Sequence, residues 1–145
     1  MDVRARLPLD LFAVVYDGRM VPGQRTDIGL AEGANCQRFA YAVLQHFGFC
    51  VPPWRSSELW DDTELSEVAD RAEPLDLALF ARTGDPWGAH VGVVVDDDRV
   101  LHLCAEVGRP TVWGFAKFAD RARYRTRIGF KRFGKAGQRV PSIIT

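Results

Sequence analysis

Hydrophobic residues recur at helical spacing in the first half of the chain. Within residues 36–47 they fall on one face of a helix, at Phe39, Val43, Leu44 and Phe47. Asn35 is a suitable N-cap for this helix, and Gly48 is a suitable stop. The pattern also predicts a short apolar helix over residues 8–16 and a second, serine-capped helix over residues 56–72.

Short apolar runs separated by turn-forming residues predict an antiparallel sheet in the second half of the chain. The expected strands cover residues 75–81, 90–95, 99–104, 111–113 and 124–133, with a short helix over 115–121 before the last strand. Three consecutive aspartates, residues 96–98, close a hairpin between the second and third of these strands. Helices followed by such a sheet are typical of an α+β fold, with the N-terminal helices packed on a central antiparallel sheet.

The size of the chain fits one domain. Its 145 residues are 47% hydrophobic, which is enough to enclose a single core. We expect a single domain over residues 1–145, in which residues 1–33 form an N-terminal element and a long loop, and residues 134–145 form a tail.

The charges balance overall but not locally. The formal net charge is zero, so we expect neither a nucleic-acid partner nor attraction to an anionic membrane. The charged residues of 58–76 are acidic except for Arg71, and those of 117–139 are basic except for Asp120. We interpret these segments as two solvated faces of opposite sign; a groove for a charged substrate is the alternative.

Cysteine usage indicates a reducing compartment, and the N-terminus does not fit a signal peptide. The three cysteines are odd in number and lack C-x-x-C spacing, which argues against a disulfide framework or a zinc ribbon. Arg4, Arg6 and Asp10 interrupt the N-terminal apolar stretch, so it makes a poor signal peptide. No apolar run is long enough to span a bilayer. We therefore expect a cytoplasmic protein, with export by a non-classical route as the alternative.

Cys36 and two histidines form the candidate catalytic group. Cys36 lies where a loop becomes a helix, and a helix N-terminus stabilises a thiolate, so we expect a lowered thiol pKa. His90 and His102 lie on the two strands of the hairpin, and an odd number of loop residues would place them on one face, opposite or diagonal, at roughly 5 Å between Cβ atoms. An even number would separate them. Gly88 and Gly92 flank His90, where we expect them to leave space for a substrate.

Four segments in this order resemble the NlpC family, the papain-like cysteine peptidases that cut bacterial cell-wall peptides. They are the nucleophile segment at residues 35–38, Pro74–Phe80, Ala89–Val94 and Val100–Cys104. The resemblance implies a papain-like fold, with Cys36 as the nucleophile, His90 as the base and His102 as the residue that orients His90. It also implies an oxyanion donor at the Cys36 backbone N–H and no metal or organic cofactor.

The nucleophile segment departs from the family pattern. Asn35-Cys36-Gln37-Arg38 stands where the family has Asp-Cys-Ser-Gly, which leaves the cell-wall specificity open. Asn-Cys also resembles the sibling CHAP amidases, but a histidine as third residue favours the NlpC side. The expected substrate-binding residues are Tyr16, as counterpart of a family tyrosine near the nucleophile, Asn35, Gln37, Trp54 and Trp87.

A metal site is the main alternative for the same residues. Cys36, His90, His102 and Cys104 could supply a zinc site, but the resemblance explains three of the four as a triad. We expect Cys50 and Cys104 to be small core residues, and His46 to lie at the surface or half-buried.

The expected activity is hydrolysis of an amide or peptide bond through a thioester. The resemblance implies a peptidoglycan-type peptide or another cell-wall fragment as the substrate and partner. An acyltransferase or transglutaminase-like reaction uses the same Cys-His chemistry, and a non-catalytic domain that binds wall fragments or a protein is a further alternative. The sequence leaves open whether the substrate is a recycled wall fragment, the target of an exported effector or an unrelated intracellular amide.

Overall fold

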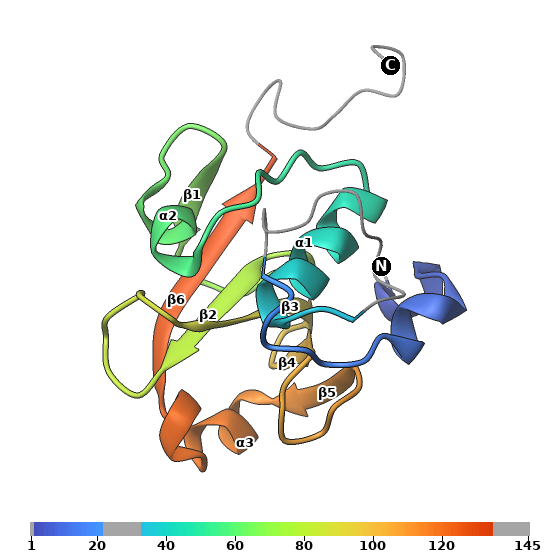
Figure 1. Cartoon of the computed structure of the whole chain (residues 1–145). Coiled ribbons are helices and arrows are strands. Elements are labelled where there is room, and N and C mark those ends of the chain that lie inside the picture. Colours follow the sequence, from blue (N-terminus) through green and yellow to red (C-terminus); the bar gives the residue numbers. More distant parts are fainter. Residues whose placement is uncertain (1, 22–32, 135–145) are drawn as a thin grey trace.

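A six-stranded antiparallel sheet forms the centre of the molecule (Figure 1). The computed structural model describes residues 2–21 and 33–134. The strand order in the sheet is β1-β6-β2-β3-β4-β5. The strands are β1 (Ser66–Ala69), β2 (Leu77–Ala81), β3 (His90–Asp96), β4 (Arg99–His102), β5 (Thr111–Gly114) and β6 (Thr126–Phe133). Helices and an antiparallel sheet together confirm the predicted α+β class.

Helix α1 (Cys36–His46) packs against β3 with its apolar face, as its sequence spacing predicts. The Asn35 side chain caps it by accepting a hydrogen bond from the Arg38 backbone N–H at 2.8 Å. After the C-cap, Phe47, the chain turns at Gly48 with φ +92°, a conformation that favours glycine. The cap matters for function because it fixes the exact residue at which the helix starts, and that residue is Cys36.

The N-terminal segment differs from the predicted helix over residues 8–16. Within this range only the 3₁₀ helix η2 (Leu9–Ala13) forms, after the extended Pro8, and another short 3₁₀ helix, η1 (Arg4–Arg6), precedes it. Four apolar side chains in and beside these helices join the main core: Val3, Leu7, Leu11 and Val14. Beyond them Tyr16 forms a parallel bridge with Ala34. Most of the predicted long loop, residues 22–32, and the predicted tail from residue 135 lie outside the described residues.

The predicted helix over residues 56–72 is wrong in its second half. Helix α2 (Ser56–Asp61) ends after six residues, and β1 follows it. The Asp62 carboxylate accepts hydrogen bonds from the backbone N–H groups of Leu65 and Ser66 at 3.0 and 2.8 Å. These bonds give the two backbone N–H groups a partner in a turn instead of in a helix. The following residues, β1, then pair with β6.

The acidic and basic segments are not simply two solvated faces, because part of each segment meets the other across the sheet. Arg132 in β6 forms ion pairs with Asp76 and Glu73, each at 2.8 Å. Lys131, buried in the same strand, donates from Nζ to the backbone carbonyls of Trp60 and Asp62. The charge asymmetry therefore contributes to holding β6 against the segment that carries α2 and β1.

The β3–β4 hairpin sets the relative position of the two histidines. Val94 pairs with Val100, so an odd number of residues, 95–99, lies between them. At the tip Asp96 pairs with Arg99 and only two residues intervene, so the register shift between Val94 and Asp96 supplies the extra residue. The odd number of residues places His90 and His102 on the same face of the sheet in diagonal positions, as we expected for an odd loop.

Two hydrophobic clusters lie on opposite faces of the sheet. The larger cluster lies under α1 and the N-terminal segment. The smaller one is formed mainly by aromatic residues under α3 (Phe115–Ala119) and the 3₁₀ helix η4 (Ala122–Tyr124), and includes Phe80, Trp113, Phe118, Tyr124 and Phe130. The histidine pair contacts this second cluster. Within the described ranges, 2–21 and 33–134, we find no helix long and apolar enough to cross a bilayer.

Gly92 is required by cross-strand packing. A Cβ atom built on Gly92 overlaps a methyl group of Val100 and lies 3.0 Å from His102 Cβ. The space beside His90 is thus filled by the partner strand, which corrects the expectation that Gly92 leaves room for substrate. Gly88, with φ +67° and no atom within 4 Å of its Cβ position, does border open space.

We predict that Gly92→Ala destabilises the protein by about 1–3 kcal/mol, because the added methyl forces β3 and β4 apart. Chemical denaturation measures the free energy of unfolding. Gly84→Ala is the matched control, since its Cβ position has no neighbour within 4 Å, and it should change the stability by less than about 0.5 kcal/mol. Equal stabilities of the two variants would contradict the proposed packing role.

Candidate active site

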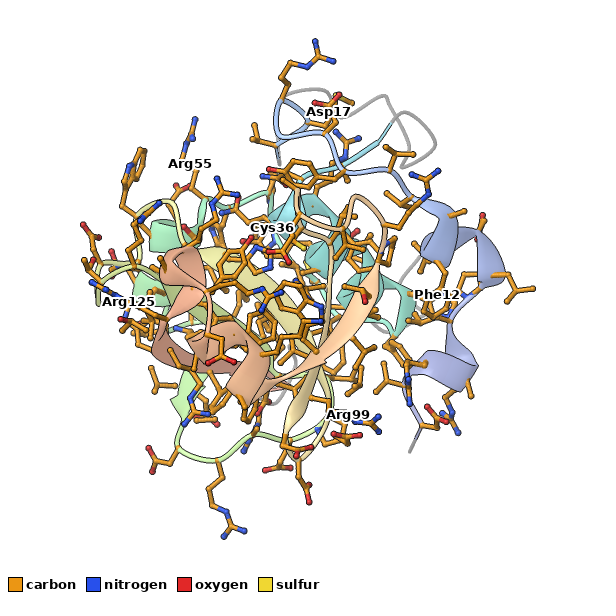
Figure 2. The ribbon with its side chains drawn as sticks, turned by 90° about the horizontal axis from the view of Figure 1, so that it is seen from below. Phe12, Asp17, Cys36, Arg55, Arg99 and Arg125 are labelled. Atoms are coloured by element: carbon orange, nitrogen blue, oxygen red, sulfur yellow. The ribbon has the colours of Figure 1, made fainter. Side chains whose placement is uncertain are left out.

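The first residue of α1 and the first residue of β3 meet at one pocket. Cys36 begins the helix and His90 begins the strand, and both line a cavity of about 440 Å³. Figure 2 shows Cys36 near the centre of the molecule, among densely packed side chains. The volume is within the range of sites that hold small molecules or short peptide segments.

His90 and His102 form a direct hydrogen bond. His90 Nε2 lies 2.8 Å from His102 Nδ1, and the two rings are nearly perpendicular, at 87°. Both residues are buried. Because Nε2 of His90 is engaged with His102, Nδ1 is the nitrogen left to exchange a proton with a group in the pocket.

Aromatic rings enclose the histidine pair. The His102 ring lies 4.4 Å from Trp113 and 4.7 Å from Phe118 between centroids, and the His90 ring lies 4.5 Å from Tyr124. Among the described residues no hydrogen-bond partner faces His102 Nε2, although this atom is buried. The enclosure fixes both rings but leaves one polar atom facing hydrophobic surroundings.

Burial dominates the protonation states of the reactive groups. It raises the pKa of the Cys36 thiol to about 11, although backbone N–H groups of Val91, Gln37 and Cys36 itself favour the thiolate. Burial, with a smaller effect of Arg123, lowers the pKa of His90 to about 3. Burial also lowers the pKa of His102 to about 2. The helix start acts in the predicted direction, but the expected low thiol pKa is wrong because desolvation is the larger effect.

Two of the five predicted substrate-binding residues line the pocket. Tyr16 lines the pocket together with Cys36, and its backbone N–H donates to the Gly108 carbonyl at 3.0 Å. Trp87 is 64% exposed and forms part of the wall, with the Arg55 guanidinium 5.8 Å from its ring centroid. An apolar ring so exposed beside a cavity is available for contact with a ligand.

The other three, Asn35, Gln37 and Trp54, do not line the pocket and make structural contacts. Asn35 caps α1, as described above. Gln37 is buried, and its side-chain amide donates to the Ala89 carbonyl at 3.5 Å, which connects α1 to the residue before His90. Trp54 packs against Phe133 on the main core, with centroids 6.4 Å apart.

The remaining cysteines and His46 lie at different depths. Cys104 is buried, as predicted, and it also lines the pocket. Cys50 is exposed, so its assignment to the core is wrong. His46 is exposed, and its Nε2 lies 2.9 Å from the Arg6 carbonyl oxygen. Across the part of the chain that the structure describes, no group of three or more His, Cys, Asp or Glu side chains is arranged to hold a metal ion.

Three residues that line or support the pocket were not among the predicted site residues. Ser56 is buried; its hydroxyl donates to the Pro86 carbonyl at 2.6 Å and accepts from the Ala89 N–H at 3.0 Å, which fixes the loop before His90. Arg123 and Tyr124 line the pocket from η4, whereas the sequence predicted only a connection at residues 122–123 and the start of a strand at residue 124. Only the closure of the sheet brings them to a histidine more than thirty positions earlier in the chain.

Comparison with known proteins supports the fold. Protein-family models give no match to the sequence, and curated proteins give none either. The structure resembles that of the NlpC/p60 domain of the peptidoglycan hydrolase SagA, with a TM-score of 0.52 and 19% sequence identity. The likeness covers 92% of this chain and 97% of that domain. The chain therefore has the papain-like fold of NlpC/p60 domains.

Proposed function

We propose that the protein is a cysteine hydrolase that cleaves an amide or peptide bond through a thioester intermediate. The observation that carries this proposal is that Cys36, at a helix start, lines one pocket with His90, and that His90 forms a hydrogen bond with the buried His102 behind it. A nucleophile, a base and a residue that orients the base are the components that covalent amide hydrolysis requires.

The tautomers of the two histidines follow from the role of His90 as base. His90 Nδ1 must hold a lone pair to accept the Cys36 proton, so Nε2 carries the proton and donates to His102 Nδ1. His102 then carries its own proton on Nε2, for which the described residues provide no hydrogen-bond partner. The aromatic surroundings support this arrangement, because the negative face of a ring tolerates an N–H group better than a lone pair.

Acylation begins with a proton transfer from Cys36 to His90. Since burial disfavours either charge alone, the proton moves from Cys36 Sγ to His90 Nδ1 as the sulfur attacks the carbonyl carbon of the substrate, and the two opposite charges stabilise each other. The backbone N–H at the start of α1 is the proposed donor to the oxyanion that forms. The intermediate then expels the amine, which takes the proton from His90 and leaves a thioester on Cys36.

Deacylation uses the same residues in reverse. His90 Nδ1 removes a proton from water, and the hydroxide oxygen attacks the thioester carbonyl. Collapse of the second tetrahedral intermediate breaks the C–S bond, and the proton on His90 returns to the sulfur. The product is a carboxylic acid, and the free thiol is restored without any group outside the pocket.

A peptidoglycan-type peptide is the proposed substrate class. The structural neighbour is a domain of a peptidoglycan hydrolase, and the pocket is large enough for a few residues of a peptide. The exposed Trp87 ring and the half-buried Tyr16 ring provide walls against which such a peptide can pack.

We predict that Cys36→Ala abolishes cleavage of muropeptides while leaving the fold intact. Mass spectrometry of the products identifies the bond that is cut, and circular dichroism checks the fold. Cys50→Ala is the matched control, because Cys50 is exposed and does not line the pocket, and it should retain wild-type activity. Cleavage at the wild-type rate by Cys36→Ala would remove the nucleophile assignment.

A second prediction concerns the residue that orients His90. His102→Leu removes the acceptor for His90 Nε2, so kcat should fall by about 100-fold with little change in KM. His102→Asn supplies a side-chain oxygen as acceptor and should recover part of this loss. His46→Gln, a change at an exposed histidine, should leave both constants unchanged. If the Leu and Asn variants have the same kcat, the hydrogen bond is not the source of the effect.

A third prediction tests the neutral resting state. Because burial raises the thiol pKa to about 11, alkylation of Cys36 by iodoacetamide should accelerate with each step in pH and show no plateau below about pH 10. Peptide mass spectrometry of a Cys50→Ser protein measures the rate at Cys36 separately from the buried Cys104. A plateau below about pH 8 would instead reveal a preformed thiolate.

A further inference from the structure

A second cavity, of about 350 Å³, opens on the smaller hydrophobic cluster beside α3. We call it the α3 groove; it is lined by Phe80, Phe115, Phe118, Tyr124, Arg125, Arg127 and two alanines of α3. Of these residues, only Tyr124 also lines the catalytic pocket, and Cys36 and His90 do not line the α3 groove. Figure 2 shows Arg125 at the periphery of the molecule, apart from Cys36. The groove is therefore a separate site, which the proposed hydrolysis does not use.

The apolar part of the α3 groove is recessed. Phe80 and Phe118 are buried, and their rings stack with centroids 4.1 Å apart at an angle of 3°. Phe115 is half-buried, whereas Ala116 and Ala119 are exposed. A ligand reaches the buried rings only by inserting an apolar side chain of its own, as anchor residues do at protein interfaces. Adsorption to a membrane surface would instead require apolar side chains that project from the protein.

Two exposed guanidinium groups lie at the α3 groove. Arg127 packs against two rings, with its guanidinium carbon 4.9 Å from the Phe115 centroid and 5.1 Å from the Phe130 centroid. Arg125 donates from Nε to the Arg82 carbonyl at 3.1 Å, which leaves its terminal nitrogens for other acceptors. Neither arginine takes part in an ion pair within the described part of the chain, and none of the residues that line the groove is acidic. Both side chains are thus held in place and lack a carboxylate, the group that a guanidinium fork binds best.

Shape and charge together favour an acidic peptide over a nucleic acid as the ligand. Binding of a nucleic-acid single strand needs free ring faces on which bases can stack. In the α3 groove Phe80 and Phe118 cover each other, and Arg127 lies over the Phe115 ring. A peptide needs no such face, because one apolar side chain can fill the recess while neighbouring carboxylates pair with the arginines.

We propose that the α3 groove is a docking site for an acidic segment of a partner protein. A bulky apolar side chain of that segment fills the recess, and carboxylates on either side of it pair with Arg125 and Arg127. Tyr124 lines the groove and its ring lies 4.5 Å from that of His90 between centroids, so the docked segment lies close to the proposed base without filling the catalytic pocket. This inference does not rest on the proposed hydrolysis, and its test needs no enzymatic activity.

Three synthetic peptides with blocked termini test the site. The first has a central phenylalanine with two glutamates on each side. In the second peptide glutamines replace the four glutamates, and in the third an alanine replaces the phenylalanine. In nuclear magnetic resonance titrations of the ¹⁵N-labelled protein at low salt, the first peptide should bind roughly 10-fold more tightly than either of the others, because each of these lacks one of the two matched features. The amides that shift should include those of Ala116, Ala119 and Arg127, and not those of Cys36 and Ala89.

Variants at the rim identify the groups that recognise charge. Arg125→Met combined with Arg127→Met keeps the aliphatic packing on the rings and should remove the preference for the glutamate peptide over the glutamine peptide. Ala119→Glu adds a carboxylate to the groove without removing a packed side chain, and it should weaken binding of the glutamate peptide more than that of the glutamine peptide. Arg4→Met, which removes an exposed charge outside the groove, should leave the preference unchanged. Wild-type-like amide spectra check that each variant is folded.

Four results would overturn the proposal. They are an unchanged preference in the double methionine variant, shifts confined to amides around Cys36, binding of none of the three peptides, and tighter binding of an oligouridylate at the same amides. The last result would assign the groove to a nucleic acid. Sedimentation equilibrium tests a further occupant: self-association of the wild-type protein that the double variant lacks would assign the groove to a second copy of this chain and would also reject the partner segment.

Discussion

The hydrogen bond between His90 and His102 is the interaction on which the proposed chemistry depends, and the β3–β4 hairpin makes it possible. The pairing at the tip of the hairpin alone would send the two side chains to opposite faces of the sheet. The additional residue at the register shift restores the odd spacing, and the missing side chain of Gly92 lets the diagonal rings approach to 2.8 Å between nitrogens. A one-residue change in register would therefore remove the pair while leaving the sheet intact.

The second constraint is burial. Enclosure by aromatic rings orients both histidines, but it also disfavours a charge on either of them and on the Cys36 thiol. In the proposed mechanism the site is therefore neutral at rest, and charge appears only as a proton moves from the Cys36 sulfur to the His90 nitrogen during attack.

Local signals in the sequence predict much of this fold. The Asn35 cap, the Gly48 stop and the short apolar runs of β2, β3 and β4 are visible because each depends on neighbouring residues. The end of α2 at Asp61 was missed, because β1 depends on pairing with β6 and on the turn made by Asp62. The direction of the thiol pKa was missed for a similar reason, since burial is a property of the assembled core. Tyr16, which was expected from the family resemblance, and Trp87 both line the pocket, whereas Arg123 is brought there by long-range closure of the sheet.

The histidine tautomers test most sharply whether His90 is a base that His102 orients, because they are observable in the free protein without a substrate. Two-bond ¹H–¹⁵N correlations of the imidazole rings, assigned with single-histidine variants, distinguish a proton on Nδ1 from one on Nε2. The proposed mechanism predicts that both rings are neutral near neutral pH. His90 then carries its proton on Nε2, which donates to His102 Nδ1, and His90 Nδ1 is unprotonated. If His90 instead carries its proton on Nδ1 and His102 donates from Nδ1 to His90 Nε2, no base faces Cys36, and this result would contradict the proposed mechanism.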